Sequence, residues 1–456
     1  MQTFGGTYVA SPTYDKNAPK CHPNTRVSFL TRLSNWVKDP ESPIDVTWLH
    51  GPVGAGKSTI ARSLAEILDA EGLLAGSFFF RTDSRRNSEK LFVVTLAYQI
   101  ARSMPVALRY ITKVVEDDPS VCSRSLQTQF EMLIVDPVAQ IEPLLPKLII
   151  IDGLDECADQ KARSTILKSI FDNLPRLRGH LKFLIVSRPE YDIQHSFNSA
   201  AASHGQHTDT IELLRDLQAY QDIRVYLRGN FDKQTHPLEV SIAPEWPSDD
   251  DIERLVEKSS GLFVYASTVI KYIKGDHDEP QQCLDNIMKL KSTSSDPHAE
   301  LDALYLSILT SSKANHTLLV NILSIIILVD QLHDKVNFRL GDQRRSFMQT
   351  DRFIGSVLFL GPEDVQLALQ DLKPLIHIIP LRRISSSTFI EFWHKSFYDF
   401  LLDPSRSKEF CVSSAYASTL VAKGCLRLLS DDIDLLDRLA RNYLHSSPFY
   451  MVLFFL

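Results

Sequence analysis

Closely spaced cysteine pairs are missing from this sequence. Its six cysteines are scattered along the chain, and no two of them form a CxxC pair. A structural zinc site needs paired ligands a few residues apart, so the spacing argues against structural zinc. Reduced, unpaired cysteines are typical of a cytosolic protein, and we therefore expect a cytoplasmic location.

An excess of positive charge is missing as well. Lysine and arginine number 49 against 56 aspartates and glutamates, which gives a net charge of -7. A nucleic-acid-binding protein usually carries a basic face or tail, and only local pairs such as Arg85-Arg86 and Arg344-Arg345 occur here. We therefore expect no nucleic acid among the partners.

Long hydrophobic runs are also absent. The longest apolar run, Leu318 to Val329, is interrupted by Asn321 and Ser324 and is too short to cross a bilayer. The N-terminal stretch MQTFGGTYVASPTYDKNAPK lacks the apolar core of a secretion signal. These absences predict a chain without a membrane span.

The first half of the chain contains short apolar runs that alternate with helical patterns. Continuous apolar strands separated by amphipathic helices indicate an α/β fold, with a parallel sheet that helices cover on both faces. From about residue 215 to about 300 only helical periodicity remains, and further helices and one alternating stretch, STFIEF, follow. The five expected strands are Val46–Leu49, Gly76–Phe80, Leu148–Ile151, Phe183–Val186 and Thr210–Leu214.

The stretch after the first expected strand is rich in glycine. Residues 51–58, GPVGAGKS, satisfy the phosphate-loop pattern GxxxxGK[ST], and an amphipathic helical pattern follows them. The glycines let backbone N–H groups surround a phosphate, the lysine reaches the β- and γ-phosphates, and the serine hydroxyl holds Mg²⁺. A chance glycine-rich turn is the alternative, and the strand–loop–helix context weighs against it. The predicted nucleotide-binding residues are Gly51, Gly54, Ala55, Gly56, Lys57, Ser58 and Thr59.

Acidic residues follow the third expected strand, in the segment LIIIDGLDE. Asp152 ends this strand, and ligands bind at the carboxyl ends of the strands in such sheets. Together with Ser58, Asp152 is the candidate Mg²⁺ ligand, because Mg²⁺ prefers carboxylate and water oxygens. Glu156 or Asp155 is the candidate for activating the attacking water. The alternative is a solvated acidic turn.

An arginine follows the fourth expected strand, in the segment KFLIVSRPE. At this position Arg188 could sense or stabilise the charge of the γ-phosphate. The alternative is a surface arginine held by the Pro189 that follows. ATP is favoured over GTP as the nucleotide, because the sequence contains no [NT]KxD motif for reading guanine.

Taken together, the segments GPVGAGKSTIA, FFFR, LIIIDGLDEC and FLIVSRPE, in this order, resemble the NACHT domains of fungal signalling NTPases. These proteins belong to the STAND class of P-loop NTPases, and the sequence is similar to the nephrocystin-like group among them. Further similarity lies in CHPNTRVSFLTRLSNWV before the phosphate loop, in GLFVYASTVIKYI of a helical domain and in HKSFYDFLLDP of a winged-helix region. The resemblance extends over about residues 21 to 405.

The resemblance implies a signal-transducing ATPase that binds ATP or ADP with Mg²⁺ and hydrolyses ATP slowly. It implies that a closed, ADP-bound state opens on exchange for ATP and then self-associates, in fungal non-self recognition or programmed cell death. It implies that the strand Gly76–Phe80 lies between the strands that lead to the phosphate loop and to Asp152. It also matches His394 to a winged-helix histidine that contacts the ADP β-phosphate; a core or helix-capping histidine is the alternative.

The patterns and the resemblance together divide the chain into five parts. We expect a flexible tail at 1–22, a NACHT P-loop NTPase core at 23–214, an all-α helical domain at 215–300, a winged-helix-like domain at 301–410, and the start of a truncated helical region at 411–456. Two alternatives to a switch stay open: a turnover ATPase, and a nucleotide-binding remnant without signalling output. The sequence does not identify effector or sensor partners.

Overall fold

The computed structural model describes residues 19–81, 89–142, 145–204, 207–213, 217–231, 246–275, 279–291, 298–335, 348–381 and 387–431. The chain divides into two compact units, residues 1–226 and 227–456, and each is described by itself. The expected flexible tail lies outside the described residues up to residue 18, and the last expected region lies outside them from residue 432.

The first unit consists of a sheet and the helices around it. Its strands are β1 Val46–His50, β2 Leu74–Phe79, β3 Lys147–Asp152, β4 Leu181–Ser187 and β5 Thr208–Glu212. Its helices are α1 Val27–Lys38, α2 Lys57–Ala70, α3 Phe92–Ser103, α4 Pro105–Asp117, α5 Leu126–Phe130, α6 Asp136–Val138, α7 Gln160–Leu177 and α8 Tyr191–His204. Helix α9, Leu217–Phe231, begins in the first unit and ends in the second.

The sheet has the strand order β2-β3-β4-β1-β5, and every neighbouring pair is parallel. The predicted parallel sheet flanked by helices is therefore confirmed. The implied position of the strand Gly76–Phe80 is wrong. This segment forms β2 at the edge of the sheet, and β4 is the strand that lies between β1 and β3.

Side chains of α3 explain why β2 is an edge strand. The Ser77 N–H donates to Gln99 Oε1 at 2.8 Å, and Gln99 Nε2 donates back to the Ser77 carbonyl at 3.0 Å. The Ser103 hydroxyl donates to the Ala75 carbonyl at 2.9 Å. These side chains use the backbone groups that a further strand would need, so they close this edge of the sheet.

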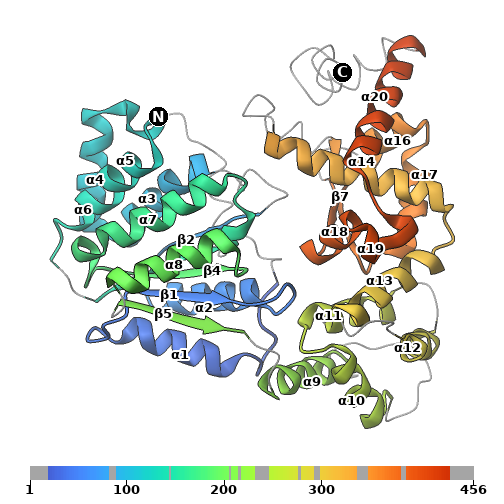
Figure 1. The fold of residues 1–456 in the computed structure, drawn as a ribbon, viewed down its shortest axis with the longest axis horizontal. Helices are drawn as coiled ribbons and strands as arrows, with labels where there is room; N and C mark the ends of the chain where they lie inside the picture. Colours follow the sequence, from blue (N-terminus) through green and yellow to red (C-terminus); the bar gives the residue numbers. More distant parts are fainter. Residues whose placement is uncertain are drawn as a thin grey trace. The chain divides into compact units, whose positions relative to one another are not determined.

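Helices cover both faces of the sheet. The face that carries Trp48 packs against α3, α5, α7 and α8, and the face that carries Leu49 packs against α1 and α2. Figure 1 shows α7 and α8 along one face and α1 along the other. Trp48 stacks on Phe197 of α8, with ring centroids 4.7 Å apart. Since both faces are dry, polar chemistry is confined to the ends of the strands.

The amino ends of the strands carry buried charged groups that lie close to polar or charged groups of the chain. Lys182, at the start of β4, is 2% exposed. Its ammonium donates to the carbonyls of Trp36 at 2.6 Å and Asp39 at 2.7 Å, and so caps the C-terminal end of α1. Asp45, just before β1, lies 3.3 Å from His207 Nδ1. These groups hold α1 and the sheet together.

The second unit is mostly helical, and its described part contains one antiparallel pair, β6–β7. A capping box between Ser248 and Asp251 starts α10. STFIEF forms β7 as predicted, whereas its partner β6 was not predicted. No helix in the described ranges is long and apolar enough to cross a membrane. The elements are α10 Asp249–Lys258, α11 Phe263–Ile273, α12 Pro280–Lys289, α13 Ala299–Ser311, α14 His316–Lys335, α16 Asp351–Leu358, α17 Pro362–Leu369, β6 Ile376–Pro380, β7 Thr388–Phe392, α18 Lys395–Leu402, α19 Pro404–Ser407 and α20 Ser414–Asp431.

Candidate functional site

The glycine-rich loop connects β1 to α2 at the carboxyl edge of the sheet. Gly54 has φ 81° and Gly56 has φ 89°, which are left-handed values that favour glycine. Within the described part of the chain, neither of these two N–H groups donates a hydrogen bond. Helix α2 begins directly afterwards, at Lys57, and adds the positive end of its dipole. The loop therefore presents a set of donors to an anion such as phosphate.

Lys57 is held inside this loop. Its ammonium donates to the carbonyls of Gly51 and Pro52, both at 2.9 Å. Burial lowers the pKa of Lys57 to about 8, against a smaller opposing effect of Asp155. A bound phosphate would offer this ammonium negatively charged oxygens in place of two neutral carbonyls.

Asp152 closes β3 and is 4% exposed. Its Oδ1 is buried and has no hydrogen-bond partner among the described residues. Burial raises the pKa of this carboxyl to about 7, and a hydrogen bond from the exposed Ser58 opposes the rise. A buried carboxylate oxygen without a partner is costly unless a ligand binds to it. Asp152 and Ser58 together therefore fit a hard cation such as Mg²⁺.

The neighbouring acids do not form a metal cage on their own. In the described ranges, no group of three or more histidine, cysteine, aspartate or glutamate side chains is arranged to hold a metal ion. Mg²⁺ usually keeps several waters and binds through one or two carboxylates and the phosphates of its nucleotide. Asp152 and Ser58 are therefore the residues that would hold it, together with phosphate and water oxygens.

Strands β3 and β4 bring the remaining predicted residues together. The Arg188 N–H donates to Asp155 Oδ1 at 3.1 Å, and its Nε lies 3.3 Å from Asp155 Oδ2. Asp155 therefore orients Arg188 with both of its oxygens, while Glu156 lies half-buried beside it in the same 3₁₀ turn. The roles assigned to these residues in catalysis stay predictions.

The other predicted residues lie as follows. The Thr59 hydroxyl donates to the Gly56 carbonyl at 2.6 Å, which stiffens the junction of loop and helix. His394 lies in the second unit, where it is the N-cap of α18. Its Nδ1 accepts from the Ser396 N–H at 3.0 Å, so the neutral ring carries its proton on Nε2. Nδ1 of His394 therefore caps helix α18, as the helix-capping alternative expects. Contact of this histidine with ADP stays a prediction.

Sequence reasoning missed Arg26. This side chain is 2% exposed, and its Nη2 donates to the Ala55 carbonyl of the phosphate loop at 2.9 Å. The segment CHPNTRVSFL predicts only the start of a helix, and the partner that holds the arginine, Asp222, lies far along the sequence.

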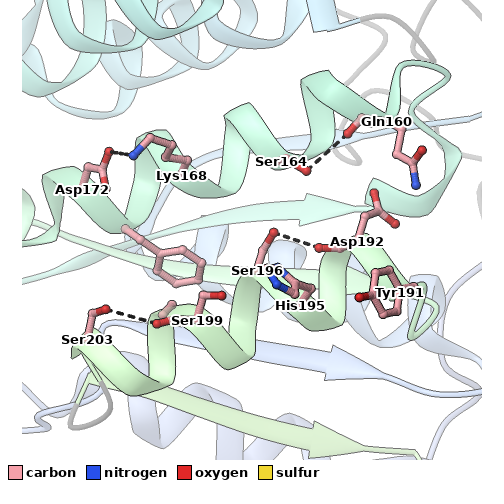
Figure 2. A pocket seen from close by; sticks show the side chains of 12 residues that line it. Gln160, Ser164, Lys168, Asp172, Tyr191, Asp192, His195, Ser196, Ser199 and Ser203 are labelled. Atoms are coloured by element: carbon pink, nitrogen blue, oxygen red, sulfur yellow. Dashed lines mark hydrogen bonds and ion pairs between the residues drawn. The ribbon is translucent and has the colours of Figure 1, made fainter.

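A groove with a volume of 560 Å³ runs between α7 and α8 (Figure 2). Several of its polar groups bond to one another or to their own helices. Lys168 pairs with Asp172 at 2.9 Å, and the Ser196 hydroxyl donates to the Asp192 carbonyl at 2.8 Å. None of the residues predicted for phosphate chemistry lines this groove, and we assign it no ligand.

The first unit thus has the architecture of a P-loop nucleotide-binding domain. Its first strand leads through a glycine-rich loop into a helix, and a buried acid ends a second strand at the same edge.

Comparison with known families agrees with this class. The family model described as nephrocystin 3, N-terminal, matches residues 26–188, a segment that contains the phosphate loop, Asp152 and Arg188. No curated protein sequence matches the chain.

Solved structures of Cdc6p and ORC proteins are distantly similar. A Cdc6p structure from Pyrobaculum aerophilum has a TM-score of 0.38 at 13% identity, covering 90% of this chain and 97% of its own. The Aeropyrum pernix ORC2 protein in ADPNP–ADP complexes has a TM-score of 0.37 at 12% identity, covering 91% of this chain and 98% of its own. The ORC1 protein of Aeropyrum pernix in complex with DNA has a TM-score of 0.35 at 11% identity, covering 92% and 97%. Likeness at this level carries no argument about function, which rests on the residues of this chain.

Proposed function

We propose that this protein is an ATP-binding signal-transduction NTPase of the NACHT type, in which exchange of ADP for ATP drives self-association. The observation that supports it most is the convergence of the phosphate loop, Asp152 and Arg188 at one edge of the sheet. A unit whose described part is mostly helical, with one antiparallel strand pair, follows in the same chain. The motif resemblance to fungal nephrocystin-like STAND proteins assigns such an arrangement to a switch.

In the proposed chemistry, the chain contributes positioning and charge. The N–H groups of Gly54 and Gly56 and the Lys57 ammonium bind the phosphates. Mg²⁺, when bound, supplies positive charge beside the phosphate oxygens. Arg188 stabilises the charge that develops on the γ-phosphoryl oxygens. Because both oxygens of Asp155 contact Arg188, we assign the general base that accepts a proton from the attacking water to Glu156.

We also propose that the second unit senses which nucleotide is bound. Residues 215–300 would form the helical domain and residues 301–410 the winged-helix-like domain, an assignment supported by helices α16, α17 and α18 with the hairpin β6–β7. The proton on His394 Nε2 suits a hydrogen bond to the β-phosphate of ADP. His394→Ala should then weaken ADP more than ATP, and equal losses for both nucleotides would rule out this contact.

The biological setting implied by the resemblance is fungal non-self recognition or programmed cell death in the cytoplasm. Self-association on ATP binding is the partner interaction that we expect; the effector and the sensor are not assigned.

The test combines nucleotide binding with size measurement. Wild-type protein and Lys57→Ala are compared for ADP and ATP affinity by fluorescent-nucleotide titration, and for mass by light scattering with each nucleotide. We expect tight ADP binding, slow hydrolysis, and a larger mass with ATP than with ADP, all lost in the variant. Normal ATP binding by Lys57→Ala would refute the site.

The two alternatives predict different outcomes of the same measurements. Fast steady-state hydrolysis would indicate a turnover ATPase instead of a switch. Nucleotide binding without any change of mass would indicate a remnant without signalling output.

A further inference from the structure

We infer that Arg26 is a positioning residue of the phosphate loop: it holds the Ala55 carbonyl outward so that the next N–H faces the bound phosphate. The inference rests on the proposed nucleotide binding and names a residue outside the loop that shapes it.

The contact itself is short and buried. Arg26 stands at the N-cap of α1 with φ 57°, a left-handed conformation, and its side chain is directed to the loop. Its Nη2 donates to the Ala55 carbonyl at 2.9 Å. Arg26 is 2% exposed and Ala55 is 3% exposed, so water does not compete for this bond.

The geometry of the peptide bond gives this contact its effect. In a planar trans peptide, the carbonyl of one residue and the N–H of the next point in opposite directions. A guanidinium that holds the Ala55 carbonyl on the outer side of the loop therefore turns the Gly56 N–H toward the inner side. Gly56 can adopt either direction because it has no side chain, so an external anchor is needed to select one.

A buried carboxylate holds the anchor in turn. Asp222 of α9 is 2% exposed. Its Oδ2 accepts from the Arg26 backbone N–H at 3.1 Å and lies 3.8 Å from Arg26 Nε. Its Oδ1 accepts from Gln218 Nε2 at 3.0 Å. A buried guanidinium requires such a partner, because an unpaired charge is costly in the protein interior.

The segment before Arg26 is fastened to the helix that starts at the phosphate loop. Lys20 pairs with Glu66 at 2.7 Å, and the Cys21 N–H donates to the Ser63 hydroxyl at 3.0 Å. Both partners lie on α2. The segment that carries Arg26 is therefore attached to α2 through Lys20 and Cys21 and to α9 through Asp222.

The experiment separates positioning from folding by using two variants and a control. Arg26→Met removes the donor and leaves the Asp222 carboxylate without a counter-charge. It is therefore compared with the double variant Arg26→Met/Asp222→Asn, which removes this charge and keeps an acceptor for the backbone N–H of residue 26. Arg163→Met is the matched control, because it breaks a partly buried ion pair of 3.5 Å to Asp192 in the same unit. Melting temperature and dissociation constants for ADP and for inorganic pyrophosphate are measured for each.

We expect both Arg26 variants to lose about ten- to a hundredfold in affinity for ADP, as for one hydrogen bond from a charged donor. The affinity for pyrophosphate should fall by the same factor, because Arg26 acts on the phosphate loop and not on the site of the adenine base. The double variant should recover melting temperature without recovering affinity, and Arg163→Met should lose melting temperature while its affinity stays that of the wild type.

Two results would overturn the inference, and they are distinguishable. If the wild type binds ADP and the double variant binds it equally well, Arg26 is only structural and the proposed function stands. If the wild type itself binds neither ADP nor pyrophosphate, the proposed function fails and the inference fails with it.

Discussion

The two ends of the parallel sheet differ in the partners of their buried charged groups. At the amino end, Lys182 donates two hydrogen bonds to carbonyls at the end of α1. Asp45 Oδ2 has no hydrogen-bond partner among the described residues, but it lies 3.3 Å from His207 Nδ1 and 3.8 Å from Arg178 Nε. At the carboxyl end, Asp152 Oδ1 has no hydrogen-bond partner among the described residues, and the Lys57 ammonium donates to two carbonyls of the loop. A polar group that folding buries is costly unless it is bonded. The difference indicates that the amino end is built for stability and the carboxyl end for a ligand.

The largest expected effect concerns the carboxyl end. Glu156→Gln keeps the size of the side chain but removes its capacity to accept a proton from water. We expect ATP turnover to fall by ~10²–10⁴-fold, the usual contribution of a general base, while ADP affinity changes little. Phosphate release and nucleotide titration measure the two quantities.

Asp155→Asn tests the assignment of the general base to Glu156 in a second way. Because Asp155 orients Arg188, this variant should lower turnover by less than Glu156→Gln does. If Glu156→Gln hydrolyses ATP at the wild-type rate and Asp155→Asn does not, the two roles are reversed.

An intermediate effect follows from the pKa of Lys57, which burial lowers to about 8. Bound phosphate favours the ammonium, so above pH 8 binding must be accompanied by uptake of a proton. ADP affinity should fall by up to ~tenfold per pH unit above pH 8. Titrations between pH 6.5 and pH 9.5 measure this.

Two observations distinguish this loss of ADP affinity from unfolding: the pH dependence of folding stability and the behaviour of Lys57→Arg. A lowered lysine pKa means that the folded state binds fewer protons than the unfolded state between pH 8 and 10.5, so the cost of burying Lys57 is relieved as pH rises. The contribution of Lys57 to stability therefore rises where affinity falls. Lys57→Arg stays charged and should bind, if more weakly, without this pH dependence. A flat profile in the wild type would contradict the prediction.

The smallest effect belongs to the amino end. Lys182→Met removes the cap of α1 and leaves the carbonyls of Trp36 and Asp39 without their donor. We expect the melting temperature to fall by ~2–8 °C and ADP affinity to stay unchanged. Lys38→Met is the control, because its pair with Glu71 is exposed and contributes little. A Lys182 variant that melts like the wild type but binds ADP poorly would reverse the comparison.

The sequence predicts the carboxyl end better than the rest of the fold. The glycine-rich loop and Asp152 are recognisable because their residues are contiguous and follow apolar strands. The strand order cannot be recognised in this way, because the edge position of β2 depends on the hydrogen bonds between Gln99 and Ser77. Such bonds join distant residues and leave no local pattern.

The same limit explains the missed contacts around Arg26. Its function in the loop depends on Ala55 and on Asp222, which lies on a helix near the end of the first unit. A single arginine before a helix has many ordinary explanations, and only the fold selects among them.

The strand order has a consequence for synthesis of the chain. Val46 of β1 pairs with Phe183 of β4 and with Thr208 of β5, and both partners are translated more than a hundred residues later. At a translation rate of ~5–20 residues per second, β1 waits on the order of ten seconds for its neighbours. The strand that leads into the phosphate loop is thus the last in the sheet to be enclosed. A nascent chain that has reached only Arg188 still lacks β5, so β1 then has only one of its two neighbours in the sheet.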